Sequence, residues 1–223
     1  MTPDPVSDAI RRRATTKLRV DPDHALPEPC PSMYETIGEL MELGCMAPHH
    51  FPCDPSHQVP PLDSPAPWRF YPLGAAACRE LMAYVLTLDG RVDKVAGMLA
   101  AADGLILVTW LPDPPMAPLP PDVPFEATRR NMEHVAGVSA AIQNMLLGAT
   151  SRGIRSYWSS GGVLRGPEVF GRLEIPLDQI LLGAVFLFPE PEGRGEVKEG
   201  ARRGTQGPPE SWMRWAEGDS PAV

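Results

Sequence analysis

Hydrophobic positions along the chain recur with two different spacings, and each spacing predicts a different kind of element. In residues 32–47 the apolar side chains return every three or four positions, which is the period of an amphipathic helix. Ser32 followed by Glu35 has the spacing of a capping box, so we expect the helix to begin there. Shorter helical patterns cover residues 5–14, 76–88 and 92–102.

The longest helical pattern runs from Phe125 to Arg152. Its apolar stripe is wider than one packing surface requires, which predicts burial on more than one side. Gly153 follows directly and is expected to end the helix in a left-handed conformation. The residues that form the stripe are Val135, Val138, Ala141, Ile142, Met145, Leu146 and Ala149.

Apolar runs rich in branched side chains predict buried strands in residues 104–111 and 179–189. Shorter strands are expected in residues 67–73 and 154–158. The order of elements is helix, helix, strand, two helices, strand, long helix, strand, strand and arm. This order predicts an α+β fold, a three-layer α/β/α sandwich around a mixed, mainly antiparallel sheet. We expect residues 1–223 to form a single domain.

Proline is unusually frequent, with 28 among 223 residues, and its clusters mark loops or extended arms. After Pro189 the chain becomes polar and rich in glycine, so we expect a C-terminal arm of about residues 190–223. Trp212 and Trp215 lie within this polar arm. Two tryptophans in such a segment need something to bury them, and a partner subunit could do so.

Composition excludes several classes of protein. The formal net charge of −8 and the pI near 5.1 argue against a nucleic-acid binder, which needs an excess of Lys and Arg on one face. We expect neither a membrane span nor a secretory signal, because no apolar run approaches ~18 residues. The four cysteines have no CxxC spacing, which suits reduced thiols in a cytoplasmic protein. His49, His50, Cys53 and His57 are close in sequence, but their order matches no zinc motif, so no metal is expected.

Within this acidic chain, residues 11–20 read RRRATTKLRV and gather basic side chains with two threonines. Such a charge run is usually a solvated helix end. Alternatively, guanidinium and ammonium groups beside a short hydroxyl can hold a phosphate dianion, and alternate positions of an extended turn can converge on one anion. The segment taken alone leaves both interpretations open.

Four separated stretches carry a family resemblance. They are RRATTKL at 12–18, APHH at 47–50 with PAPWRFY at 65–71, GVSAAIQNMLLGATSRGIRSYWSSG at 137–161, and QILLGAVFLFPEP at 179–191. In this order they resemble the FMN-dependent nitroreductase family, most closely its short, single-domain branch. The resemblance implies the three-layer fold expected above, with a C-terminal arm that is exchanged in a homodimer and with FMN as the cofactor.

The resemblance also implies the cofactor-binding residues. In the family, the first motif holds the FMN phosphate, and the loop after the strand that ends in YW brings backbone N–H groups to the flavin N5 edge. The histidine of the second motif lies beside the isoalloxazine, contributed across the dimer, and a late basic residue in the arm contacts the phosphate. The residues so implied are Arg13, Ala14, Thr15, Lys17, His50, Trp158, Ser159, Ser160, Gly161 and Arg203.

The activity implied by the resemblance is that of an oxidoreductase. NAD(P)H would reduce FMN, and the flavin would reduce a small acceptor such as a nitroaromatic or a quinone in a ping-pong cycle. Because the family protein supplies few acid–base side chains, we name no catalytic residue. Ala66 stands where the family has a flavin-contacting glutamine, and residues 51–64 form an insertion that could roof the site. These two departures favour an alternative, a flavin-binding protein or sensor without turnover.

Overall fold

The structure is a computed structural model that describes residues 4–23, 26, 28–88, 90, 92–189, 195–201 and 205–216. Its main sheet has four antiparallel strands in the order β2-β3-β5-β4. β3 is buried along its whole length and β5 along most of it, as expected for central strands covered on both faces. The strands are β2 (Trp68–Gly74), β3 (Gly104–Trp110), β4 (Arg155–Ser159) and β5 (Ile180–Phe188).

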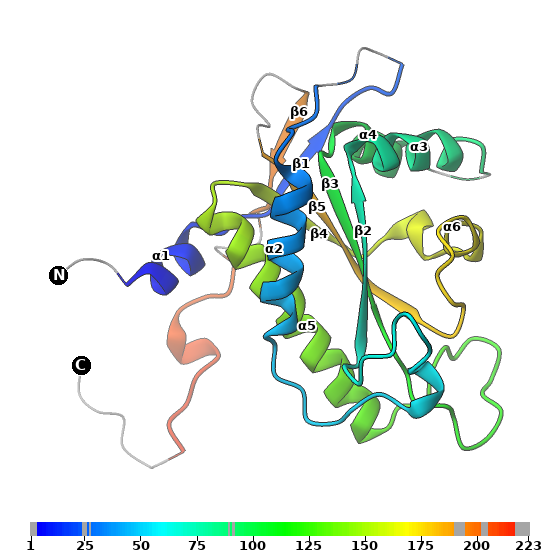
Figure 1. Ribbon diagram of the computed structural model, residues 1–223. Coiled ribbons are helices and arrows are strands. Elements are labelled where there is room, and N and C mark those ends of the chain that lie inside the picture. Colours follow the sequence, from blue (N-terminus) through cyan, green and yellow to red (C-terminus); the bar gives the residue numbers. More distant parts are fainter. Residues whose placement is uncertain are drawn as a thin grey trace.

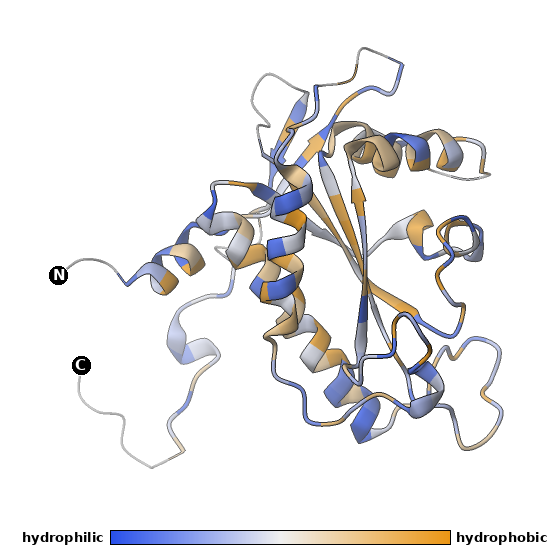
Figure 2. Cartoon of the chain, viewed as in Figure 1, coloured by the Kyte–Doolittle hydropathy of each residue, from blue (hydrophilic) through white to orange (hydrophobic). Residues whose placement is uncertain are grey.

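Helices cover both faces of this sheet and make a three-layer sandwich (Figure 1). One core cluster joins the sheet to α2 and α5, and the other joins it to α3, α4 and α6. Figure 2 shows hydrophobic residues concentrated on the strands between these layers. The predicted α+β sandwich is therefore confirmed. The helices are α2 (Met33–Cys45), α3 (Ala75–Val85), α4 (Asp93–Ala101), α5 (Arg129–Ser151) and α6 (Pro167–Arg172).

The ends of the two long helices correct the sequence prediction. Ser32 precedes α2 but makes no side-chain capping bond, so the expected capping box is not formed. α5 begins four residues later than predicted, because the Thr128 hydroxyl accepts a hydrogen bond from the Asn131 N–H at 3.1 Å and caps the helix. Gly153 does adopt the predicted left-handed conformation, with φ of 75°.

The wide apolar stripe of α5 is buried within the chain itself. α5 packs against β3, β4 and β5 on one side and against α2 on the other. Val138, Ile142 and Met145 are fully buried in the core cluster shared by these elements. The prediction of burial on two sides is correct, but a partner subunit is not needed to explain it.

Two short strands were not predicted from the sequence. β1 (Thr16–Arg19) and β6 (Glu196–Glu199) pair in an antiparallel two-stranded sheet, although their sequences are 177 or more residues apart. Residues 16–19 were expected to form an extended turn, not a strand. β1 follows α1 (Pro5–Arg12), and a parallel bridge between Thr15 and Ser156 joins the start of β1 to the edge strand β4. The named strands of both sheets pair antiparallel, so the strand arrangement of the described residues is mainly antiparallel, as predicted.

The insertion and the arm extend from the sandwich. Residues 51–64 contain the short helix η1 (Pro55–His57) and lie beside β2, to which Arg69 binds them through backbone carbonyls. Another short helix, η2 (Gly162–Arg165), follows β4. The arm contains the short helix η4 (Pro209–Ser211). Among the residues that the structure describes, no helix combines the length and hydropathy needed to cross a bilayer.

Candidate functional site

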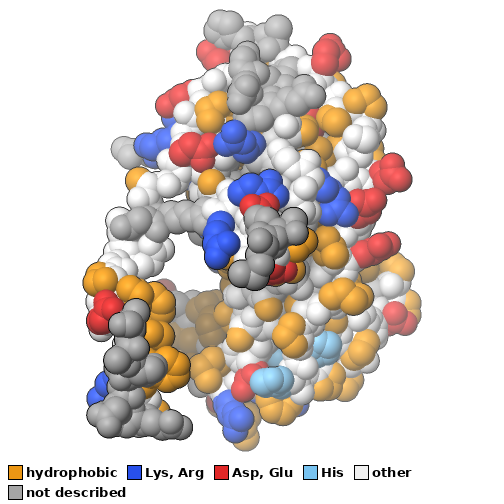
Figure 3. All heavy atoms as spheres, turned by 90° about the vertical axis from the view of Figure 1, so that its left-hand side faces the viewer, with side chains coloured by type: hydrophobic (Ala, Val, Ile, Leu, Met, Phe, Trp, Pro, Cys, Tyr) orange, Lys and Arg blue, Asp and Glu red, His pale blue; other side chains and the backbone are white. Residues whose placement is uncertain are grey.

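A cavity of about 600 Å³ lies where β1, the end of β4, β6 and the arm meet. Figure 3 shows a hollow between the arm and the body of the molecule on this side, with basic side chains nearby. The size of the cavity falls in the ~300–1,000 Å³ range of small-molecule sites. The residues that line it are Arg13, Ala14, Thr15, Lys17, Tyr157, Trp158, Lys198, Glu199, Gly200, Ala201 and Gln206.

The cavity brings together segments that are far apart in the sequence. Arg13, Ala14, Thr15 and Lys17 come from the basic N-terminal motif, and Trp158 comes from the third motif. These five are cofactor-binding residues predicted from the sequence. Strand pairing holds the two motifs side by side, so a single ligand in the cavity could contact both of them.

Positive charge dominates the lining. Arg13, Lys17 and Lys198 are the cations, and Glu199 is the only carboxylate among the described lining residues. Glu199 is already engaged, since one carboxylate oxygen lies 2.8 Å from Arg155 Nη1 and also accepts from the Thr16 hydroxyl at 3.0 Å. The cavity therefore presents an excess of cationic donors to an anion.

Aromatic side chains form part of the same wall. Lys17 Nζ lies 4.6 Å from the centre of the Tyr157 ring, a cation–π contact that fixes the ammonium group. The Trp158 side chain lies across Gly183 of β5, where a Cβ atom would stand 2.6 Å from the indole Cδ1. Glycine at that position allows this close approach and leaves Trp158 partly exposed toward the cavity.

Backbone contacts close the cavity on the side of the arm. The Gly200 N–H donates to the Thr15 carbonyl oxygen at 2.8 Å, directly after β6. A Cβ atom on Gly200 would lie 2.9 Å from the Thr15 Cβ, so a larger residue would push the two segments apart. The contact aligns the arm with the predicted phosphate motif.

The predicted polar loop lies next to the cavity but does not line it in the described chain. The Ser159 hydroxyl accepts a hydrogen bond from the Gly161 N–H at 3.2 Å, so that amide is already used within the loop. The Ser160 carbonyl accepts from Arg165 Nε, and Ser160 itself is exposed. Gly161 has φ of 104°, which allows the sharp turn into η2.

The other predicted residues lie elsewhere. His50 is on the loop after α2, exposed, with Nδ1 at 2.6 Å from Glu133 of α5, and it does not line the cavity of its own chain. Arg203 lies outside the described residues. Ala66 lies just after the insertion, and its carbonyl accepts from Arg69 at 2.9 Å. No residue of the insertion is among the described residues that line this cavity within one chain.

The histidines and the cysteine near residue 50 have separate partners. His57 contacts the Pro112 carbonyl through Nε2 at 2.8 Å, and its Nδ1 is 3.4 Å from Asp178. His49 packs edge-on against Trp68, and the buried Cys53 thiol donates to the Ser64 carbonyl. Within the described part of the chain, no group of three or more His, Cys, Asp or Glu side chains is arranged to hold a metal ion.

Sequence reasoning missed the side of the cavity that the arm supplies. Lys198, Glu199 and Gly200 line it because β6 pairs with β1. Four consecutive exposed, mostly charged residues carry no hydrophobic pattern that would indicate a strand. Tyr157 could have been found, since it lies beside Trp158 in the third motif.

Comparisons with known proteins identify the fold. A comparison with protein-family models gives no match, and a comparison with curated proteins gives none either. Among solved structures, the chain is similar to a nitroreductase-like family protein from Bacillus cereus, with a TM-score of 0.65, 19% identity, and 98% of this chain and 99% of that chain covered.

Two further similar structures contain FMN. A putative nitroreductase from Desulfovibrio desulfuricans in complex with FMN has a TM-score of 0.53 and 23% identity, covering 87% of this chain and 91% of that one. A nitroreductase with bound FMN from Bacteroides fragilis has a TM-score of 0.52 and 20% identity, covering 91% and 97%. The fold is therefore nitroreductase-like, as the sequence resemblance implied.

Proposed function

We propose that this protein is an FMN-dependent oxidoreductase, with FMN bound in the cavity between β1, β4 and β6. The observation that carries the proposal is the convergence of the basic N-terminal motif and the third motif on one cationic cavity with an aromatic wall. The proteins of the same fold that are crystallised with FMN support the choice of cofactor.

The residues present fit FMN. Arg13 and Lys17 would bind the phosphate as cationic donors, with the Thr15 hydroxyl as a short neutral donor. Tyr157 and Trp158 supply aromatic surface for the apolar part of the ligand. When bound, FMN supplies the hydride chemistry, whereas the chain binds and orients it. FMN is favoured over FAD because the cationic motif suits a terminal phosphate.

The remaining parts of the proposal concern the reaction partners and the assembly. NAD(P)H would be the electron donor, and a nitroaromatic or quinone would be the acceptor. The functional unit would be a homodimer in the cytoplasm, with His50 of one subunit near the flavin of the other and Arg203 near the phosphate. Ser160 would offer the amide of the polar loop to the flavin, since the Gly161 amide is used by Ser159.

A second candidate is a flavin-binding protein that does not turn over. It is favoured by Ala66, where the family places a flavin-contacting glutamine, and by the internal hydrogen bond of the Gly161 amide. Both features reduce the number of polar groups that the chain can direct at a flavin ring.

An absorbance spectrum of the purified protein, before and after anaerobic NADPH or NADH, tests both candidates. The oxidoreductase should be yellow, and its 450 nm absorbance should bleach with one of the two donors and return with a nitroaromatic or quinone. A yellow protein that neither donor bleaches would favour the flavin binder. A protein that remains colourless after incubation with FMN would contradict both.

The Arg13→Ala variant tests where the phosphate binds. Removing one guanidinium from an anion site should weaken FMN binding by about 1.5–3 kcal/mol. Quenching of FMN fluorescence gives the dissociation constant, and Arg129→Ala, which alters a highly exposed cation on α5, is the control. Equal FMN affinity in the Arg13 variant and the wild type would remove Arg13 from the site.

A further inference from the structure

The short ladder between β1 and β6 contains one pair of like charges. Lys17 lies directly opposite Lys198, whereas Arg19 forms an ion pair with Glu196. Thr16, at the other end of the ladder, donates its hydroxyl to Glu199. The ladder is thus held by polar attractions at its ends and opposed by a lysine pair between them.

Beyond the ladder, β6 is held by the ion pair between its Glu199 and Arg155 of β4. All of its four residues are exposed, and within the described residues its only strand neighbour is β1. β1 is anchored by the fully buried Thr16 and Leu18, whereas β6 adds to it as an exposed edge strand, and such an edge is marginal in water. A repulsive pair at its centre should therefore have a measurable effect on how firmly β6 is held.

The lysine pair stands between two cavities. Lys17, Tyr157 and Lys198 line both the 600 Å³ cavity and a neighbouring one of about 150 Å³. The smaller cavity is otherwise lined by Arg19, Lys94 and Met98, with no carboxylate among its described lining residues. An anion held beside the pair would be attracted to both ammonium groups and would offset their repulsion.

We propose that Lys198 is a phosphate-binding residue and that bound phosphate strengthens the pairing of β6 with β1, so that the strand acts as a clasp. The proposal rests on the proposed function, because FMN is taken to supply the phosphate. The pairing also links the ligand to the arm. Gly200 lies two residues after Lys198, and its N–H donates to the Thr15 carbonyl within the phosphate motif. Ligand binding and attachment of the arm would then be thermodynamically coupled.

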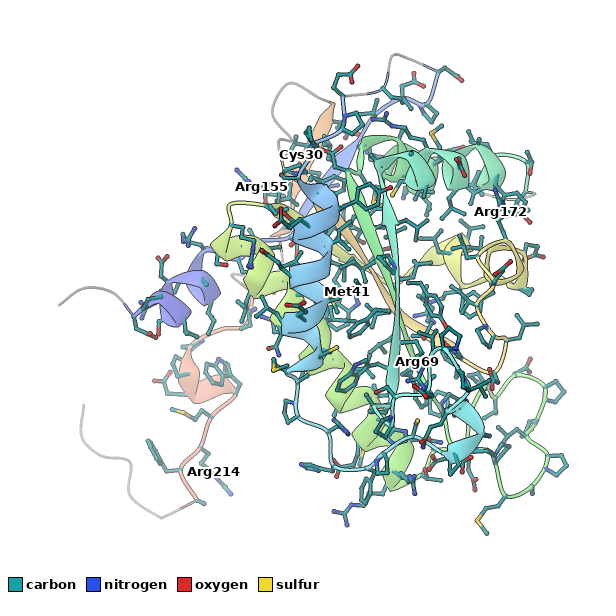
Figure 4. The ribbon with its side chains drawn as sticks, in the orientation of Figure 1. Cys30, Met41, Arg69, Arg155, Arg172 and Arg214 are labelled. Atoms are coloured by element: carbon teal, nitrogen blue, oxygen red, sulfur yellow. The ribbon has the colours of Figure 1, made fainter. Side chains whose placement is uncertain are left out.

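The Lys198→Glu variant should separate strand pairing from phosphate binding, because it should strengthen the pairing of β6 with β1 and weaken the binding of FMN. Without ligand, Glu at 198 opposite Lys17 would replace repulsion by attraction, so β6 should exchange its amide hydrogens more slowly than in the wild type. FMN affinity should fall by roughly tenfold or more, the loss expected for one charge-assisted hydrogen bond. Lys198→Gln should show a smaller change in both quantities. Arg172, on α6 and lining neither cavity, supplies the controls for net charge: Arg172→Glu matches Lys198→Glu, and Arg172→Gln matches Lys198→Gln (Figure 4).

Hydrogen exchange of residues 195–201 with FMN, riboflavin and inorganic phosphate is the decisive measurement. FMN and phosphate should slow exchange in the wild type, and riboflavin, which lacks the phosphate, should not. Equal slowing by riboflavin, or unchanged FMN affinity in Lys198→Glu, would overturn the clasp while leaving the proposed function intact. If FMN does not bind at all, the proposed function fails, and the response to phosphate alone decides the clasp.

Discussion

At the scale of single residues, Gly183 and Trp158 show how the absence of one side chain shapes the candidate site. A Cβ atom at position 183 would overlap the indole of Trp158 and would also stand 3.1 Å from Ile142 Cδ1. Because Trp158 is partly exposed, Gly183→Ala should displace its indole from β5 toward the cavity. We expect a loss of about 1–3 kcal/mol in unfolding free energy, together with a shift in tryptophan fluorescence and weaker FMN binding.

Gly38→Ala is the matched control for this substitution. Gly38 lies inside α2, and a Cβ atom there would meet nothing within 4 Å. The same chemical change should therefore stabilise the protein by about 0.5–1 kcal/mol, because alanine is the better helix former. If both variants have the wild-type melting temperature and fluorescence, the packing of Trp158 on Gly183 has no energetic importance.

The buried Cys78 thiol predicts how stability depends on alkaline pH. Burial, and then the nearby Asp103, raise the pKa of Cys78 from 9.0 to about 12. The folded state thus retains the thiol proton where the unfolded state has lost it. This contribution is complete below pH 9 and decreases as pH rises toward 12, by about 1.4 kcal/mol per pH unit.

Urea unfolding at pH 8 and pH 10.5 measures this loss. Tyr71 has a raised pKa through burial and acts in the same direction above its ordinary value of 10.0, so the wild type alone cannot isolate the thiol. Cys78→Ala removes the titrating group, and its stability should fall less between the two pH values. Parallel losses in variant and wild type would contradict the assignment to Cys78.

At the scale of elements, one buried side chain of β2 binds the insertion of residues 51–64 at several points. Arg69 of β2 is only 4% exposed, and its guanidinium donates to the carbonyls of His57 and Ser64 at 2.8 and 3.0 Å. Further bonds reach the carbonyls of Ala66 and Trp68. Four carbonyls thus share one cation, which no lysine could satisfy with three donors.

Arg69→Met should therefore release the insertion while keeping much of the side-chain volume. We expect a loss of roughly 3 kcal/mol in unfolding free energy, because several buried carbonyls lose a charged donor. Limited proteolysis should show new cleavage between residues 51 and 64, and Arg172→Met on α6 should show neither effect. A variant with wild-type stability and no new cleavage would show that the insertion is held by other contacts.

The periodicity of hydrophobic residues predicted the elements that bury an apolar face in the core. α5, β3 and β5 were recognised because their apolar residues face the core on one side or on both. β1 and β6 were missed because their pairing joins residues 16–19 to 196–199: β1 is only four residues long, and the exposed, mostly charged residues of β6 carry no periodic signal. The capping box at Ser32 failed for a similar reason, since the motif permits the bond but does not enforce it.

The candidate site could be predicted only where its residues belong to a motif that is recognisable in the sequence. Arg13, Thr15 and Lys17 carry a recognisable motif, and the cavity includes them. Lys198 and Gly200 enter the cavity only through the β1–β6 pairing, so no local pattern could assign them. The donors of the polar loop depend on which amides are free, and the bond from Gly161 to Ser159 is visible only in three dimensions.

At the scale of the whole molecule, the arm carries the remaining argument for a homodimer. The apolar stripe of α5 does not require a partner, since α2 and the sheet cover it. The arm is different, because Trp212, Met213 and Trp215 are 63%, 48% and 54% exposed in the single chain. Figure 3 shows hydrophobic side chains on the arm beside the hollow. Such a group of large apolar side chains is typical of an interface.

Deleting residues 201–223 tests this arrangement while leaving β6 in the chain. If the arm packs against a second subunit, the truncated protein should dissociate at lower concentration, because an obligate interface buries ~2,000 Å² or more and the arm would contribute part of it. It should also retain less flavin, because Ala201 and Gln206 line the cavity. Trp212→Ser/Trp215→Ser keeps the chain length and should weaken the dimer with a smaller effect on the flavin. Sedimentation velocity followed at 280 and 450 nm reports both quantities. A truncated protein that sediments as a yellow dimer would show that the arm serves neither purpose, and a yellow monomer at full length would exclude an interface site.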